Sequence, residues 1–333
     1  MDPVTTSRPF IKSPFITGMI KLFDTLRYKK RHFGVASCVL LTGESGSGKS
    51  ALAEYYVKVN PVTEQVERTH IPVLHFELKA ISTPLDFIRS LLIAIGDPQH
   101  GMGANNQGEL YDRLITLIRE TGIELLILDE IQVIIERRSA KVVTGIADIF
   151  KDLIKDTKIP IVFIGMPWSK YLVDSNRQLK RRIAYRHVVP PFRISQKNER
   201  DNYRRLLRML SDAYQITTDI KLEDIFVTYR MFAATSGNLS STAGLISDAY
   251  MLSKMEDKVI DLNLFADVMR SYGIDDIVNP FLLPLEQLEL RELIVPSDWH
   301  FGYRANKNSI VEPEYVVYGI ASNKKLYTID GAS

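Results

Sequence analysis

The sequence is poor in cysteine and in long apolar runs, and its charges nearly cancel. Its 333 residues include a single cysteine, Cys38, which cannot form a disulfide within the chain and is typical of a reducing compartment. No apolar run approaches the roughly 18 residues of a membrane span. The first ten residues lack the apolar core and small-residue cleavage site of a secretion signal. We therefore expect a cytoplasmic protein with no membrane partner.

The charge balance excludes a globally basic protein. The chain has 42 Lys and Arg against 40 Asp and Glu, for a net charge of +2. A surface that binds nucleic acid must therefore be local. Hydrophobic residues make up 45% of the chain, as in soluble globular proteins. The length is about twice the ~150 residues typical of one domain, which predicts two packed domains.

The first two thirds of the chain alternate short apolar runs with segments of helical periodicity. Strands are predicted at Ala36–Thr42, Pro72–Leu78, Glu124–Asp129, Ile159–Gly165 and, less cleanly, Tyr185–Phe192. Helices are predicted between them at Ser50–Lys58, Pro84–Ile95, Glu109–Thr121 and Val142–Lys155. This alternation indicates βαβ units and a parallel sheet.

From Asn198 onward the pattern predicts helices only. They are expected at Glu199–Tyr214, Leu222–Ser236, Ser240–Met255 and Asp261–Tyr272. After Ile274 four prolines interrupt any period, so an extended or partly ordered tail is expected. It either packs on its own domain or binds a partner. The predicted organisation is an N-terminal extension (1–34), an α/β domain (35–194), a helical domain (195–274) and a tail (275–333).

A phosphate-binding loop follows the first predicted strand. The motif G-x-x-x-x-G-K-[ST] is matched by Gly43, Glu44, Ser45, Gly46, Ser47, Gly48, Lys49 and Ser50. Its position between a strand and a helix is the context that the motif requires. Backbone N–H groups and the helix N-terminus would hold the phosphates of ATP. Lys49 would contact the β- and γ-phosphates, and the Ser50 hydroxyl would ligate Mg²⁺.

A second motif ends the third predicted strand. Leu125–Leu128 is apolar throughout and is followed by Asp129 and Glu130. A buried central strand of this kind delivers its terminal acids to the carboxyl edge of the sheet. Asp129 is placed to hold Mg²⁺, and Glu130 is placed to act as general base toward water. Together with the phosphate loop, the pair predicts ATP hydrolysis.

The sequence contains neither L-S-G-G-Q nor N-K-x-D, which speaks against transporter-type ATPases and guanine specificity. The segments Gly43–Ser50, Leu125–Gln132 (LLILDEIQ), Ile159–Met166 (IPIVFIGM) and Gln178–Arg182 (QLKRR) together resemble the TniB/TnsC family. That family comprises AAA+ regulators of DNA transposition. The resemblance covers about residues 35–250.

The resemblance implies a fold class and a set of partners. The fold would be an α/β AAA+ P-loop NTPase core, with a five-stranded parallel sheet flanked by helices, followed by a small helical lid. ATP and Mg²⁺ would support a homo-oligomeric ring or filament on double-stranded DNA. The oligomer would link a TniQ/TnsD-type target selector to a DDE transposase of the TnsB type. A TnsA-type endonuclease is a further candidate partner.

A basic cluster lies downstream of the fourth predicted strand. Between Arg177 and Arg208 the basic residues far outnumber the acidic ones, Glu199 and Asp201. By resemblance, Arg182 and Arg181 match the AAA+ arginine that reaches a neighbouring subunit's γ-phosphate, with Arg177 as a further candidate. The alternative is a solvated basic face.

The chain departs from the wider AAA+ pattern at two positions. In AAA+ proteins a polar residue at the end of the fourth strand, called sensor 1, is common. In this chain the residues that end and follow the fourth predicted strand offer no polar side chain before Ser169. The turn Gly237–Ser240 carries a serine where a second sensor is commonly arginine. We therefore expect slow turnover that depends strongly on assembly.

Two loops could follow the DNA backbone without reading its sequence. One contains Lys79, and the other contains Arg137, Arg138 and Lys141. Each could equally be an ordinary solvated loop. Base-reading modules are not visible in the sequence, so sequence-independent binding is expected.

Two rival functions remain open. An ATPase of the origin-recognition or helicase-loader kind would carry a winged-helix domain after the lid, which the proline-interrupted tail matches poorly. A non-enzymatic scaffold would assemble on ATP binding alone. Glu130 argues against a scaffold, and the missing sensors argue for it.

Overall fold

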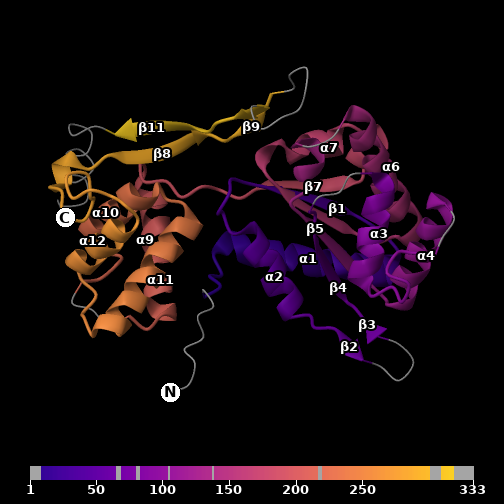
Figure 1. Cartoon of the computed structure of the whole chain (residues 1–333), viewed down its shortest axis with the longest axis horizontal. Helices are drawn as coiled ribbons and strands as arrows, with labels where there is room; N and C mark the ends of the chain where they lie inside the picture. Colours follow the sequence, from indigo (N-terminus) through magenta and orange to yellow (C-terminus); the bar gives the residue numbers. More distant parts are fainter. Residues whose placement is uncertain are drawn as a thin grey trace.

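The computed structural model describes residues 9–64, 69–79, 83–103, 106–136, 139–216, 220–300 and 309–318. Figure 1 shows an α/β domain and a helical domain side by side, with C-terminal strands lying across one edge of both. The N-terminal segment, residues 9–13 before the first helix, passes between the two domains.

The α/β domain is built on one parallel sheet. Its order is β4 (Val73–Glu77), β5 (Leu125–Asp129), β6 (Ile161–Gly165), β1 (Cys38–Thr42) and β7 (Ile183–Val188). Every residue of β1, β5 and β6 is buried, which explains why these strands read as unbroken apolar runs. The predicted five-stranded parallel sheet is confirmed.

One strand lies earlier than predicted. The sequence pattern placed the last strand at 185–192, whereas β7 ends at Val188. Pro190 and Pro191 follow and have no N–H to donate to a neighbouring strand. The last bond of this ladder is therefore the one from Val189 N to Thr42 O, at 2.7 Å.

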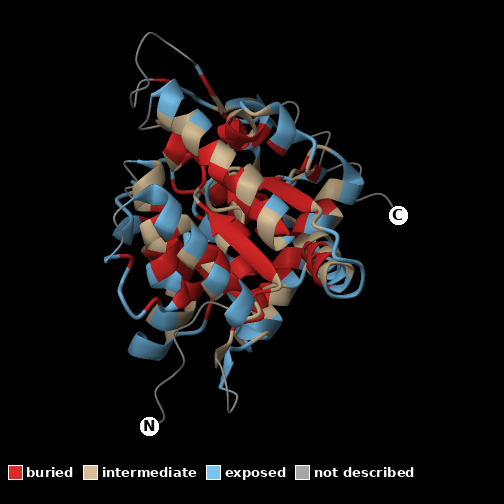
Figure 2. Ribbon diagram, turned by 90° about the vertical axis from the view of Figure 1, so that its right-hand side faces the viewer, coloured by how far each residue is buried: buried red, intermediate tan, exposed pale blue. Residues whose placement is uncertain are grey.

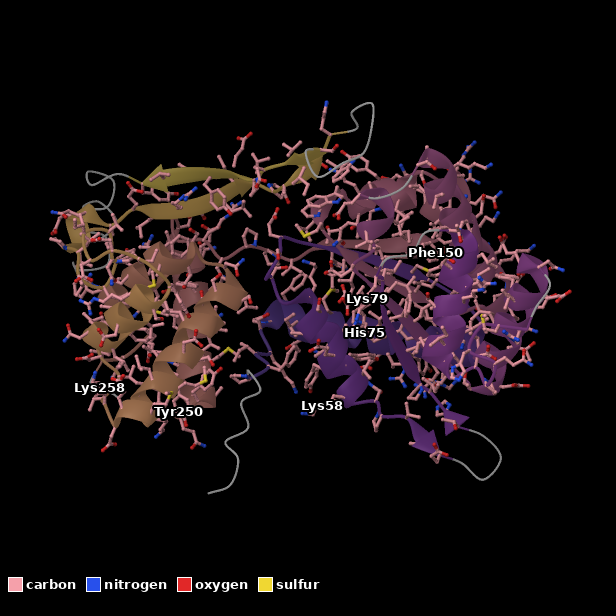
Figure 3. The ribbon with its side chains drawn as sticks, in the orientation of Figure 1. Lys58, His75, Lys79, Phe150, Tyr250 and Lys258 are labelled. Atoms are coloured by element: carbon pink, nitrogen blue, oxygen red, sulfur yellow. The ribbon has the colours of Figure 1, made fainter. Side chains whose placement is uncertain are left out.

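Helices cover both faces of the sheet, as Figure 2 shows by the buried strands within a partly exposed shell. One face carries α3 (Pro84–Ile95), α4 (Gln107–Glu120) and α6 (Ala140–Thr157). Phe150 of α6, labelled in Figure 3, lies edge-on to Phe87 and Phe163, with ring centroids 5.0 and 5.1 Å away. The other face carries α1 (Pro14–Phe33) and α2 (Lys49–Lys58).

Helix α1 packs into the α/β core. It begins at the cap Ser13, whose hydroxyl accepts from Ile16 N, and it ends at Gly34 in the left-handed conformation. Its buried face contains Ile16, Met19, Phe23 and Leu26, which pack against β1 and α2. Residues 1–34 were expected to form an extension, and their helix contributes to the core of the sheet.

Several short elements have no counterpart in the sequence prediction. They are β2 (Thr63–Glu64), β3 (Thr69–His70), α5 (Val133–Glu136), η1 (Pro167–Ser169), α7 (Lys170–Asp174) and α8 (Arg177–Lys180). None exceeds five residues, so none spans enough turns or alternations to produce a periodic signal.

The helical domain has its own apolar core. Helices α9 (Lys197–Ala213), α10 (Ile225–Thr235), α11 (Leu239–Glu256) and α12 (Leu262–Ser271) surround the fully buried side chains of Tyr203, Phe232 and Phe265. All four predicted helices are present, with ends shifted by a few residues.

The C-terminal segment contains strands that the sequence did not reveal. After η2 (Leu285–Gln287), β8 (Leu290–Val295) pairs antiparallel with β11 (Glu314–Tyr318), and β9 (Asp298–Trp299) pairs with β10 (Ile310–Val311). Leu290 is buried in the core of the helical domain, whereas Trp299 is buried in that of the α/β domain. The segment therefore contacts both domains and contains paired strands, whereas an extended or partly ordered tail was expected.

A buried carboxylate joins this segment to the connection between the domains. Glu292 of β8 is 3% exposed and accepts from the backbone N–H groups of Ile194 and Ser195, both at 2.9 Å. The Ser195 hydroxyl donates to the other oxygen of the Glu292 carboxylate, also at 2.9 Å.

Among the described residues, no helix is long and apolar enough to cross a membrane.

Replacing Glu292 should destabilise the protein strongly. Glu292→Ala leaves two N–H groups without their acceptor, at a cost of about 2–4 kcal/mol in the free energy of unfolding. Denaturant titration measures this cost. Glu289→Ala, at an exposed position on the same segment, serves as the matched control and should change stability by less than about 0.5 kcal/mol. Equal effects of the two substitutions would contradict the anchoring role of Glu292.

Cys38 should resist thiol reagents in the folded state. Burial raises the pKa of its thiol to about 12, so little thiolate forms at pH 8. Between the ordinary thiol pKa and this value the folded state retains a proton that the unfolded state releases, so stability falls as pH rises through that window. Labelling with an aromatic disulfide at pH 8 should be slow without denaturant and fast with it. Fast labelling of the folded chain would contradict the buried placement.

Candidate functional site

The phosphate loop connects β1 to α2. Gly46 and Gly48 have φ angles of +72° and +91°, in the left-handed region that favours glycine. Gly43 N donates to Gly165 O at 3.3 Å, which ties the start of the loop to the end of β6. The Lys49 ammonium lies inside the loop and donates to Gly43 O at 2.7 Å and Glu44 O at 2.8 Å. The loop thus surrounds a buried cation with backbone dipoles.

Burial and the neighbouring acids have opposite effects on the pKa of Lys49, and the effect of burial is the larger. Burial lowers the pKa of the ammonium, while Asp129, Glu130 and Glu44 act in the opposite direction. An anion beside Lys49 would supply the charge that burial leaves uncompensated. The cation is therefore suited to binding phosphate oxygens.

Asp129 lies at the end of β5, beside the phosphate loop. Its side chain is almost fully buried, and burial opposes its charge. The neighbouring imidazole of His75, the Ser50 hydroxyl and the Glu130 N–H outweigh that effect, so the pKa of Asp129 is below its ordinary value. His75 Nε2 is 3.5 Å from Asp129 Oδ2. Ser50 and Asp129 together present hard oxygen ligands, which suit Mg²⁺ with phosphate and water completing its shell.

Glu130 adopts an unusual backbone conformation immediately after β5. Its φ is +59°, which is rare for a residue with a side chain and costs of order 1–2 kcal/mol. Its carboxylate oxygen Oε2 accepts from Gln132 Nε2 at 2.5 Å. Gln132, the last residue of the LLILDEIQ segment, is thus in direct contact with the predicted general base.

A turn of the helical domain contacts the outside of the phosphate loop. Asn238 Nδ2 donates to Ser45 O at 2.8 Å, and Ser240 N donates to Gly46 O at 2.9 Å. A Cβ on Gly46 would lie 2.6 Å from Asn238 Oδ1, so the close approach requires glycine. The turn at 237–240 lacks the expected arginine, but its polar groups hold the loop carbonyls instead.

The C-terminal segment also reaches the phosphate loop. Ser297 donates to the Glu44 carboxylate through its backbone N–H at 2.6 Å and through its hydroxyl at 2.7–2.8 Å. Asp298, the next residue, accepts from Lys170 Nζ at 2.9 Å. The first contact joins residues 253 positions apart in the chain and the second joins residues 128 apart, so no local sequence pattern could have indicated either.

A cavity of about 520 Å³ adjoins the phosphate loop between the two domains. Glu44 and Ser47 form its loop side. Its apolar walls come from the N-terminal segment, the connection after β7 and the helical domain, through Ile11, Phe15, Ile16, Val189, Pro190, Pro191, Leu206 and Leu239. The cavity has the size and lining of a small-molecule site.

The predicted arginines lie away from these groups within the single chain. Arg177 begins α8, and Arg181 and Arg182 follow that helix directly. Arg177 and Arg181 are exposed and Arg182 is half-buried. Within the described parts of the chain, none of their guanidinium groups takes part in an ion pair or hydrogen bond.

Of the four predicted DNA contacts, the structure describes Lys79 and Lys141. The Lys79 side chain is 80% exposed, and its Nζ lies 3.8 Å from Glu77 Oε2, which makes a weak surface ion pair. Figure 3 shows Lys79 near His75 within the α/β domain. Lys141 is exposed in the first turn of α6. Arg137 and Arg138 lie outside the described residues.

The sheet order, the phosphate loop, the acidic pair after β5 and the adjoining helical domain define an AAA+ P-loop nucleotide-binding protein. The model of the family described as "Bacterial TniB protein" matches residues 7–193, more than half of the chain. The chain belongs to the TniB family. No curated protein sequence gives a significant match.

Solved structures with a similar fold include two proteins of Aeropyrum pernix. The ORC1 protein in complex with DNA is 17% identical with a TM-score of 0.55, over 86% of this chain and 72% of that one. The ORC2 protein in ADPNP–ADP complexes is 15% identical with a TM-score of 0.56, over 80% of this chain and 70% of that one. At this identity the likeness concerns the fold alone.

Loss of the Asn238 amide should weaken nucleotide binding with little loss of stability. In Asn238→Ser the new hydroxyl can still cap α11, but it is too short to reach Ser45 O. The loop then loses one hydrogen bond that orients its peptides, worth about 1 kcal/mol, or about fivefold in affinity. Titration with a fluorescent ADP analogue measures the change.

Asn106→Ser is the matched control, because Asn106 caps α4 in the same way at a distance from the loop. It should leave nucleotide affinity unchanged. Equal affinity in Asn238→Ser and in the wild type would show that the turn does not support the loop.

Proposed function

We propose that this protein is an ATPase that assembles on double-stranded DNA and regulates DNA transposition. The observation that carries the proposal is the meeting of Lys49, Ser50, Asp129 and Glu130 at one sheet edge in a chain of the TniB family. Lys49 binds the β- and γ-phosphates, and the loop N–H groups of residues 43–50 bind phosphate oxygens.

Ser50 and Asp129 would hold Mg²⁺, and the oxygen donors and the low pKa of Asp129 fit this ion. The bound ion would neutralise charge on the phosphates. Glu130 accepts a proton from the attacking water while the water oxygen bonds to the γ-phosphorus and the bond to ADP breaks. The protein's contribution is mainly orientation and electrostatic stabilisation.

The apolar cavity beside the loop suits the adenine base. It adjoins Glu44 and Ser47, so a nucleotide whose phosphates occupy the loop could place its base against the apolar walls of this cavity, to which Phe15 and Pro190 contribute. Because the N-terminal segment and the helical domain both line this cavity, base binding would draw the two domains together. The wall from Ile11 to Ile16 also gives the N-terminal segment a role in nucleotide binding.

Assembly would complete the site. Arg182 or Arg181 has a guanidinium without a partner in the described chain, and either could reach the γ-phosphate of a neighbouring subunit. Such an arrangement makes hydrolysis depend on oligomerisation. Family membership and the fold shared with a DNA-bound ORC1 protein support duplex DNA as the scaffold. Lys79, Arg137, Arg138 and Lys141 are the proposed backbone contacts.

In transposition, the assembled oligomer would link a TniQ/TnsD-type target selector to a TnsB-type DDE transposase. This role rests on family membership. The helicase-loader alternative is disfavoured because the described residues after α12 contain strands and a short 3₁₀ helix, without the α-helices of a winged-helix domain. For the scaffold alternative, the presence of Glu130 beside the phosphate loop argues against it, and the missing sensors argue for it.

Two substitutions should separate nucleotide binding from hydrolysis. Lys49→Ala removes the cation from the loop and should abolish ATP-dependent assembly on random-sequence duplex DNA. Glu130→Gln should still bind ATP and assemble, but with hydrolysis reduced by about 100-fold or more, because the amide cannot accept the proton. Light scattering and phosphate release, each with and without DNA, measure the two properties.

A Glu130→Gln protein that disassembles as readily as the wild type would contradict the general-base role. A wild-type protein that stays monomeric with ATP and DNA would contradict the proposed function itself. Binding to purified target selector and transposase then tests the transposition role against the loader alternative.

A further inference from the structure

Gln132 forms a buried bridge between two strands of the site. It is 5% exposed, and its amide nitrogen donates to Glu130 Oε2 at 2.5 Å. Its amide oxygen accepts from the backbone N–H of Met166, directly after β6, at 3.1 Å. Because Met166 N can only donate, the orientation of the amide is determined, and its NH₂ group must point at Glu130.

The end of β6 is shaped to admit this side chain. A Cβ on Gly165 would lie 2.6 Å from Gln132 Oε1 and 2.2 Å from Ser169 Oγ. Gly165 therefore leaves open the space into which Gln132 extends from the neighbouring strand. The same glycine accepts the bond from Gly43 N, so the phosphate loop, β6 and Gln132 meet at one residue.

The backbone between Glu130 and Gln132 is arranged for this contact. Glu130 has a φ of +59°, which turns the chain sharply, and Ile131 N then donates to Ile164 O at 3.1 Å. The turn brings the Gln132 side chain back toward Glu130. A conformation of this energetic cost persists only where the surrounding contacts hold it.

We propose that Gln132 is a positioning residue for Glu130 and thereby sets the rate of hydrolysis in this protein. The inference rests on the proposed ATPase function. By binding one carboxylate oxygen, the amide restricts rotation of the Glu130 side chain and leaves the other oxygen to accept a proton from water. Gln132 itself touches neither substrate nor metal ion. Its contribution is the orientation of a group that does.

The predicted signature is a fall in kcat without a matching loss of nucleotide affinity. Gln132→Leu removes both hydrogen bonds at similar volume, and Gln132→Glu keeps the acceptor for Met166 N while removing the donor to Glu130. Each should lower kcat by about 10- to 100-fold and change ADP affinity by less than about twofold. The assay uses the full-length protein with duplex DNA, and phosphate release is measured over a range of ATP concentrations.

Ser169→Ala is the matched control. Ser169 is fully buried at the same glycine, and its hydroxyl has no hydrogen-bond partner in the described part of the chain. Removing this hydroxyl should leave kcat within about twofold of wild type. If Ser169→Ala lowers kcat as much as Gln132→Leu, the effect belongs to packing and the positioning role is overturned.

A double substitution tests whether Gln132 acts through Glu130. In a protein that already carries Glu130→Gln, adding Gln132→Leu should change the residual rate by less than about twofold, because the group to be positioned is gone. Full additivity of the two losses would overturn the proposal, as would a Gln132→Leu or Gln132→Glu protein with wild-type kcat. If the wild type itself releases no phosphate, or Glu130→Gln has no effect, the proposed function fails before this inference is reached.

Discussion

The site depends on a single steric constraint: β6, which lies between β1 and β5, must end in a residue without a side chain. The phosphate loop follows β1, and the acidic pair consists of Asp129, the last residue of β5, and Glu130, so the two motifs are separated by the width of one strand. At the end of β6, Gly165 allows groups from both neighbours to approach each other. The loop is anchored there through Gly43 N, and Gln132 reaches across from the β5 side.

The second layer of organisation is the contact of three distant segments with the phosphate loop. The turn at 237–240 holds two loop carbonyls, and Ser297 holds the carboxylate of Glu44. The N-terminal segment completes the adjoining cavity. The contacts of the turn and of Ser297 use hydrogen bonds to loop carbonyls and to the Glu44 side chain, groups that the phosphates do not need, so these two segments hold the loop from outside. Glu292 then ties the C-terminal segment to the connection between the domains.

Much of the fold could be read from the sequence, because its main elements are long or strongly patterned. The buried strands are continuous apolar runs, and each helix of the helical domain spans several turns with an apolar face. The errors have equally physical causes. β7 was placed too late because Pro190 and Pro191 follow an apolar stretch that only partly forms a ladder. β8 and β11 were missed because the residues that pair lie in a segment broken by prolines, and their pairing is a long-range contact.

The sequence by itself determined the chemistry of the phosphate loop, the acidic pair and the parallel sheet, because those features depend on residues close together in the chain. Only the tertiary structure decided which residues support them. Asn238, Glu292 and Ser297 are ordinary polar residues with no local signature, and Gln132 is visible in the sequence only as the last residue of a family motif, which does not indicate its contacts. Their roles arise from hydrogen bonds to groups on other strands or another domain. Such partners are defined by how the sheet orders its strands and how the domains meet, and neither is encoded in local spacing.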